Sequence, residues 1–141
     1  MVQFYLLSII ANVVGGLALS SGYIEEKVPA LAGIKKFFNS RPTLRTYIGA
    51  VTALVGVLKL LGATGGDVPF FGDLVPALTG LVVGTALLVD RYKESATMVE
   101  EHQTGLIATI DRVILKRRNA IGTIAVFVGL VHFLLPRLLL L

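Results

Sequence analysis

Two basic side chains, Lys59 and His132, stand alone in long apolar stretches of this 141-residue chain. Ionisable groups inside a membrane are costly and commonly mark an ion pathway or a binding site. A pair of basic groups at an outer vestibule would favour anions. The alternative interpretation is structural, because a lysine close to the end of a membrane helix can extend its ammonium to the interface. The sequence leaves both interpretations open.

Other polar side chains, Asn12, Thr52, Thr79 and Thr85, lie within apolar stretches. An amide or hydroxyl group in hydrocarbon needs a hydrogen-bond partner. Asn12 is therefore expected either to bond across to another helix or to line a polar cavity with the threonines. On the second interpretation Asn12, Thr52 and Thr85 extend the candidate pathway of the two basic groups.

Several kinds of chemistry are excluded by what the chain lacks. It has no cysteine, which excludes disulfides, thiolate chemistry, iron–sulfur clusters and cysteine zinc sites. Glu100, Glu101 and His102 are consecutive, and consecutive residues on a helix point in different directions, so they are not expected to hold a metal. The sequence also lacks a serine–histidine–acid set and paired carboxylates within an apolar stretch. We therefore expect no enzyme, no catalytic residues, no metal and no cofactor.

Apolar segments long enough to cross a bilayer must position these side chains. The chain is 55% hydrophobic and only 16% charged, with a mean hydropathy of +0.81. A membrane helix needs about 20 apolar residues. The sequence predicts an all-α integral membrane protein, a single domain over residues 1–141, with four membrane helices at Val2–Tyr23, Thr46–Ala63, Leu74–Val89 and Asn119–Leu135. Pro76 is placed in the first turn of the third helix, where proline is tolerated.

The distribution of basic residues predicts the orientation. The segments Gly22–Arg45 and Asp90–Arg118 hold eleven of the thirteen lysine and arginine residues, whereas Gly62–Asp73 holds none. Because basic loops remain in the cytoplasm, both termini are expected outside, in a bacterial-type plasma membrane. The apolar run at residues 4–19 lacks a basic leader and is expected to be retained as a membrane helix.

Each basic segment also carries a stripe of apolar residues at helical spacing. The stripes consist of Val28, Leu31, Ile34 and Phe38 in the first segment and of Leu106, Ile107, Ile110, Val113 and Ile114 in the second. Such helices either lie in the membrane interface or pack on the ends of the membrane helices. The basic residues Lys35, Lys36, Lys116, Arg117 and Arg118 indicate anionic lipid headgroups or a partner protein as ligand, rather than nucleic acid.

The two halves of the chain form a candidate internal repeat. Residues 45–56 align with residues 118–129 at an offset of 73, which also aligns Lys59 with His132. The first and third predicted membrane helices align at an offset of 69. Repeat units of about 2–63 and 74–136 would form two tandem hairpins that enter the membrane in the same direction, related by an axis along the membrane normal.

Small residues recur on one face of the second and fourth predicted membrane helices. They are Gly49, Ala53 and Gly56 on the second and Gly122 and Gly129 on the fourth. Small residues let membrane helices approach closely, so these positions are expected to be helix contacts. Glycine is also simply common in membrane helices.

Two classes of function remain open. The first is a small polytopic channel or transporter, which implies a homo-oligomer because four helices enclose little space. The repeat and the Lys59–His132 pair favour it. The second is a non-transporting scaffold or an accessory subunit of a larger membrane complex. The near absence of charge in the middle of the membrane helices favours it, because proton and cation coupling usually needs buried carboxylates.

Overall fold

All the secondary structure in the described part of the chain is helical. The computed structural model describes residues 2–62, 70–95 and 105–134. The elements are α1 (Val2–Leu19), α2 (Ser21–Lys27), the 3₁₀ turn η1 (Pro29–Leu31), α3 (Ile34–Asn39), α4 (Pro42–Gly62), α5 (Phe70–Ser95), α6 (Gly105–Val113), the 3₁₀ turn η4 (Leu115–Arg117) and α7 (Arg118–Leu134). The predicted all-α class is confirmed. Glu100, Glu101 and His102 lie outside the described residues.

Two helices are long and apolar enough to cross a membrane, namely Pro42–Gly62 and the Leu74–Ser95 part of α5. A third candidate is the bent pair formed by Tyr5–Leu19 and Ser21–Lys27, if the two helices are counted as one span. These lengths are compatible with a membrane location. The described part of α7 has 17 residues.

The first membrane helix was predicted to reach Tyr23, and this boundary is wrong. Helix α1 ends at Leu19 and the chain turns by 85° into α2. The Ser20 hydroxyl donates to the Gly16 carbonyl, 2.7 Å away, a bond that bends helices. Because Ser20, the residue between the two helices, is also a weak helix former, the apolar run breaks there rather than continuing as one helix.

The third membrane helix was predicted to be the shortest, but α5 is the longest helix, with 26 residues. It continues past Val89 because its charged end is stabilised by ion pairs, including Arg91 with Glu94 at 3.2 Å on the same face. Its earlier start at Phe70 puts Pro76 inside the helix and not in the first turn as predicted. A proline there removes one backbone hydrogen bond of the helix.

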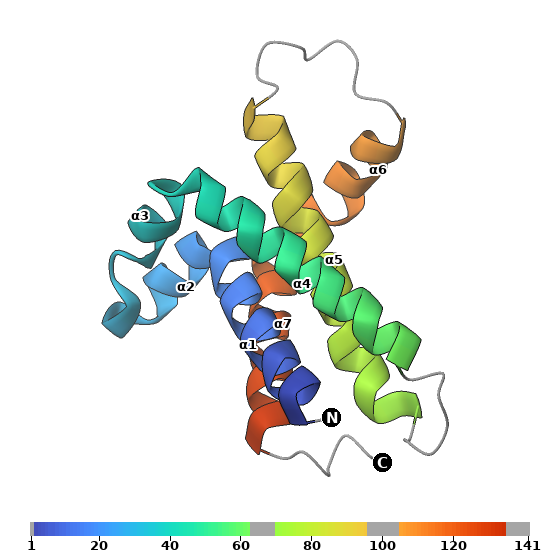
Figure 1. The fold of residues 1–141 in the computed structure, drawn as a ribbon. Helices are drawn as coiled ribbons and strands as arrows, with labels where there is room; N and C mark the ends of the chain where they lie inside the picture. Colours follow the sequence, from blue (N-terminus) through green and yellow to red (C-terminus); the bar gives the residue numbers. More distant parts are fainter. Residues whose placement is uncertain (1, 63–69, 96–104, 135–141) are drawn as a thin grey trace.

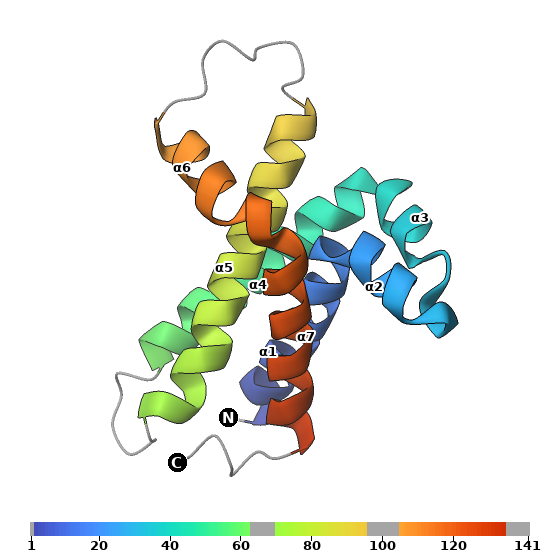
Figure 2. The same ribbon diagram turned by 180° about the vertical axis from the view of Figure 1, so that it is seen from behind.

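The long helices pack in two close pairs, α4 with α5 and α1 with α7 (Figure 1). Helices α1 and α5 lie against each other and join the pairs. In the reverse view α7 lies in front of α1 and α5 in front of α4 (Figure 2). The predicted hairpins α1–α4 and α5–α7 are therefore interleaved, since each helix packs most closely on a helix of the other half.

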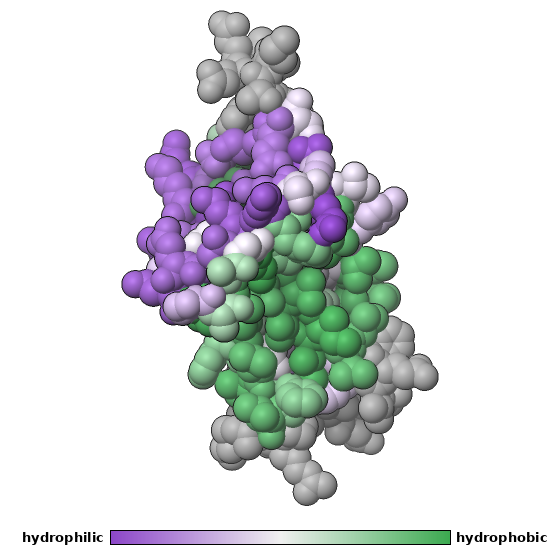
Figure 3. Space-filling view, turned by 90° about the vertical axis from the view of Figure 1, so that its left-hand side faces the viewer, coloured by the Kyte–Doolittle hydropathy of each residue, from purple (hydrophilic) through white to green (hydrophobic). Residues whose placement is uncertain are grey.

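The short helices gather at one end of the bundle. The first predicted amphipathic helix is divided into η1 and α3 by Gly33, whose φ of 91° is accessible chiefly to glycine. Phe38 and Leu115 are buried in the core of the bundle, whereas Phe37 and Leu106 are exposed. Some apolar residues of these segments therefore pack on the long helices and others face outward. Figure 3 shows hydrophilic residues collected at this end and a broad apolar area below them.

Candidate functional site

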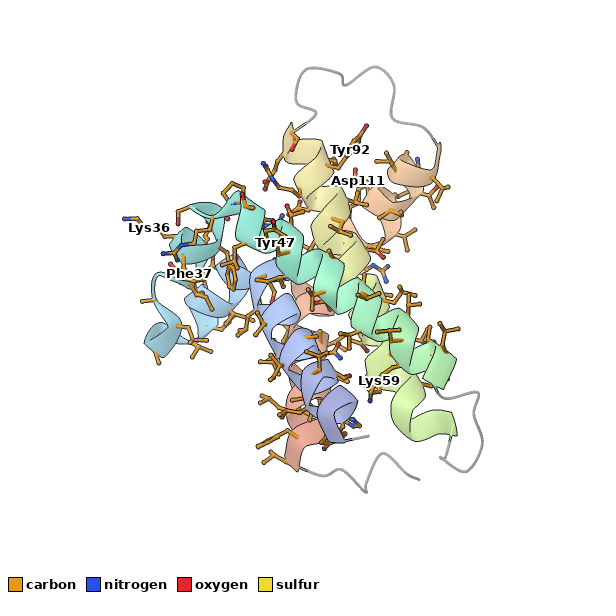
Figure 4. The ribbon with its side chains drawn as sticks, viewed as in Figure 1. Lys36, Phe37, Tyr47, Lys59, Tyr92 and Asp111 are labelled. Atoms are coloured by element: carbon orange, nitrogen blue, oxygen red, sulfur yellow. The ribbon has the colours of Figure 1, made fainter. Side chains whose placement is uncertain are left out.

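The two isolated basic residues of the sequence lie in contact. Lys59 on α4 and His132 on α7 are both buried, and the lysine Nζ lies 3.4 Å from the histidine Nε2. Lys59 lies near the end of α4 that is remote from the charged helices (Figure 4). Its ammonium can donate to Nε2 only when the ring proton is on Nδ1. The lysine is thus drawn inward to the histidine rather than outward to the interface.

Tyr5 completes this cluster and was not singled out in the sequence. Its hydroxyl donates to the backbone carbonyl of His132, and the two rings lie 4.6 Å apart between centroids. The Lys59 Nζ lies 5.9 Å from the centre of the Tyr5 ring, a cation–π distance. Helices α1, α4 and α7 therefore meet at one Tyr5–Lys59–His132 cluster. The tyrosine lies in an apolar run at the N-terminus, and no spacing in the sequence connects it with the other two residues.

Asn12 bonds across to another helix, as one of its two interpretations required. Its amide donates to the Ser8 carbonyl on α1 and to the Pro76 carbonyl on α5, at 3.0 Å each. Thr52 of α4 donates to the Ala11 carbonyl at 3.3 Å. Asn12 thus ties α1 to α5, and Thr52 ties α4 to α1. The Asn12 Oδ1 is buried and has no hydrogen-bond partner among the described residues.

The predicted threonine lining divides between different surfaces. Thr79 donates to the Val75 carbonyl of its own helix and lines an apolar groove between α5 and α7. Thr85 is half-buried one and a half turns further along α5. Of the pathway residues predicted from the sequence, Lys59 and His132 therefore lie in one cluster and Asn12 and Thr52 bond to neighbouring helices, whereas Thr85 joins neither group.

An ion-pair network links three helices at the charged end. Arg45 of α4 is 5% exposed and donates to Asp90 and, at 2.7 Å, to Glu94, both on α5. Arg118, at the start of α7, reaches the same Asp90 at 3.4 Å. Arg45 and Arg118 are the residues that the 73-residue offset aligns. The alignment was visible in the sequence, but their shared carboxylate was not.

The predicted docking residues are exposed at this end. Lys35, Lys36, Lys116, Arg117 and Arg118 all reach the surface, and Figure 4 shows Lys36 beside Phe37 on α3. The Arg41 guanidinium lies 4.2 Å from the centre of the exposed Phe37 ring. On the other side, Lys93 and Asp111 form an ion pair at 2.6 Å that holds α6 against α5. Exposed basic and aromatic groups together are typical of a surface that meets lipid headgroups.

The glycines lie where helix backbones touch. A Cβ atom added to Gly16 of α1 would lie 2.5 Å from the Gly122 carbonyl oxygen of α7. One added to Gly84 of α5 would lie 2.6 Å from the Gly49 carbonyl oxygen of α4. These distances are below any real carbon–oxygen contact, so only glycine fits. Ala53 also belongs to this contact, because its backbone faces Gly84.

Comparison with known proteins gives a family match without a described activity. A family model matches residues 1–132. No curated protein and no solved structure matches the chain.

Proposed function

The chain belongs to the family whose sequence model matches residues 1–132, a family of unknown function, and we propose that it is a non-transporting component of a membrane. In this proposal four helices cross the bilayer, and the charged end presents a docking surface on the cytoplasmic side. The observation that carries the proposal is that glycines bring the helix backbones into direct contact, between α1 and α7 and between α4 and α5.

The packing supports a duplicated unit. Gly56 on α4 faces the Ala77 carbonyl and Leu81 amide, and Gly129 on α7 faces the Ile9 carbonyl and Val13 amide. The α4 and α7 members differ by 73 residues, and the α5 and α1 members by 68. The Gly49–Gly84 and Gly122–Gly16 contacts repeat the same two offsets. The second offset differs by one residue from the predicted 69, and in this proposal Gly16 rather than Gly15 corresponds to Gly84.

We infer four spans from this correspondence. Helix α1 packs on α7 as α5 packs on α4, and the pair α4–α5 contains the two helices that meet the length of a membrane span. In a membrane, every exposed backbone group must be satisfied within the helix, so a packed partner of a spanning helix shares its environment. The basic end would then face the cytoplasm, with both termini opposite.

A filled interior argues against a pathway through one chain. Val83, Ala86, Leu87 and Ala125 lie in the centre with 0% exposure. The Asn12 amide N–H groups and the Thr52 hydroxyl are engaged with backbone carbonyls, including those of neighbouring helices. A conduction path needs a continuous polar lining, and close packing of small and apolar side chains provides none.

The decisive experiment is flux measured in liposomes that contain the purified chain, together with its oligomeric state in detergent. We expect no conductance for potassium, chloride or protons above protein-free liposomes. Selective flux through a defined oligomer would contradict the proposal.

A second candidate function keeps transport in view, because the Lys59–His132 contact places two basic groups 3.4 Å apart. In this alternative a homo-oligomer carries anions past the Tyr5–Lys59–His132 cluster. Lys59→Ala should then lower anion flux or change its selectivity. Thr43→Ala, on the exposed start of the same helix, is the matched control and should leave flux unchanged.

A further inference from the structure

The seam between α5 and α7 differs from the other close helix contacts. Gly84 faces α4, and Gly122 and Gly129 face α1, so these glycines draw α5 and α7 toward other helices rather than toward each other. The seam contains an apolar groove of about 240 Å³ lined by Leu78, Thr79, Val82, Ile121 and Ile124. The Thr79 hydroxyl is satisfied by the Val75 carbonyl, so the groove offers an apolar surface.

Basic residues stand at the charged end of this α5–α7 groove. Ile121 lies one turn beyond Arg118 on α7, a rise of about 4.5 Å. On α5, Val82 lies eight residues before Asp90, about 12 Å along the helix. Because Arg118 contacts Asp90, the groove leads directly to this ion pair.

Arg118 has donors to spare for a ligand. Its contact with Asp90 is long, at 3.4 Å, and its side chain is 46% exposed. Asp90 already accepts from Arg45, whose side chain is 6% exposed. A guanidinium has five N–H groups, so several donors of Arg118 can face outward. Within the described ranges, neither Lys116 nor Arg117 forms an ion pair, and both are exposed beside it.

We propose that the α5–α7 groove binds an anionic phospholipid, with an acyl chain along the groove and the headgroup phosphate at Arg118. Charge complementarity selects this occupant, because an apolar groove that ends at surplus positive charge matches a molecule with an apolar tail and a negative head. The inference rests on the proposed membrane location, but not on the absence of transport.

The corresponding position in the first half lacks this capacity. Arg45 occupies the same place on α4 as Arg118 on α7, yet it is buried and bound by two carboxylates. The site is therefore expected once per chain.

The absence of tryptophan allows a local test. A single tryptophan at Ile124, in the groove, is compared with one at Leu54, an equally exposed position on α4. Both variants are reconstituted with phosphatidylcholine and phosphatidylglycerol, one lipid at a time carrying brominated acyl chains that quench tryptophan. The measured ratio is the quenching by brominated phosphatidylglycerol divided by the quenching by brominated phosphatidylcholine. For Ile124→Trp we expect a ratio of about five. For Leu54→Trp the ratio should be near one.

Arg118→Gln should bring the Ile124→Trp ratio close to one, and Arg118→Lys should retain part of the preference. Lys116→Gln with Arg117→Gln tests the charge without touching the Asp90 contact, and should lower the ratio. If Ile124→Trp does not fold, Leu78→Trp places the reporter on the other wall. Inorganic phosphate should leave the ratio unchanged; its loss would assign Arg118 to a soluble anion instead.

The outcomes separate the two proposals. Equal ratios at Ile124 and Leu54, or a ratio that persists in Arg118→Gln, would overturn the lipid site while leaving the membrane location intact. If neither tryptophan is quenched by either brominated lipid, the membrane location itself fails, and the lipid site fails with it.

Discussion

The α1–α7 and α4–α5 interfaces are built alike but end differently. Each interface has two places where a glycine meets the backbone of the other helix. Corresponding residues of the two interfaces differ by 68 positions on α1 and α5 and by 73 on α4 and α7. Beyond them, Gly122 faces Ser20 and Gly49 faces Leu88, and these two partners also differ by 68. Ser20 bonds back to Gly16 and α1 ends, whereas Leu88 packs and α5 continues to Ser95. Equivalent packing therefore does not require equivalent helix ends.

The largest expected effect comes from filling the two backbone contacts. Gly16→Val and Gly84→Val should each prevent stable folding, because the new side chain would meet backbone that cannot move aside. Circular dichroism during denaturation in mixed micelles measures the loss. Gly62→Ala, with open space around the position, should change stability by less than about 1 kcal/mol. Tolerance of valine at only one of the two positions would break the correspondence between the interfaces.

Asp90→Asn should have the next largest effect, about 1.5–3 kcal/mol, because it removes one of the two carboxylates that bind the buried Arg45 and leaves only Glu94. Chemical denaturation in micelles provides the measurement. Lys93→Gln disrupts the more exposed pair with Asp111, and its expected cost is about 0–1 kcal/mol. Equal costs for the two variants would show that Asp90 has no special role in joining the halves.

Asn12→Leu should lower the free energy of unfolding by about 0.6–1.7 kcal/mol, the range for hydrogen bonds between membrane helices. It removes the bond to Pro76. Only the first half supplies such a donor, because the residue of the second half that corresponds to Asn12 at the 68-residue offset is Gly80. Thr52→Val, which removes the bond to Ala11, is the comparison and should cost a similar amount. No loss in either variant would mean that packing alone joins α1 to its neighbours.

Ser20→Ala should have the smallest effect, about 0.5–1 kcal/mol, because one hydroxyl-to-carbonyl bond is lost. The control Thr123→Ala removes the same kind of bond on an exposed face of α7. Spin labels on two introduced cysteines, at Ile10 and Glu26, report the bend in a chain that has no native cysteine. An unchanged label distance in Ser20→Ala would assign the bend to the packing of α2 rather than to Ser20.

Apolar composition predicted the helical class and the approximate places of the long helices. Helix ends were predicted less well, because an end depends on local hydrogen bonds and tertiary ion pairs. Helix α1 ends next to Ser20, inside an apolar run. Helix α5 continues past the end of its apolar run, where the ion pairs formed by Arg45 and Lys93 stabilise it.

The candidate site was predicted in part. The repeat drew attention to Lys59 and His132 together, and the structure places them in contact. Tyr5 and the carbonyl of Pro76 were missed, because backbone acceptors and lone aromatic residues leave no pattern in a sequence. The α5–α7 groove was missed as well, since it results from the direction in which neighbouring glycines draw the two helices.

The ion pair of one carboxylate with two arginines has a consequence for how the halves came to be joined. In a symmetric dimer of identical two-helix chains, any acid at this place would occur twice and would neutralise both arginines. On the proposed duplication, the counterpart of Asp90 is Gly22, so a fused chain can keep one acid and discard the other. On these proposals, fusion would release Arg118 from a purely structural task, which no assembly of identical halves could do for one arginine alone.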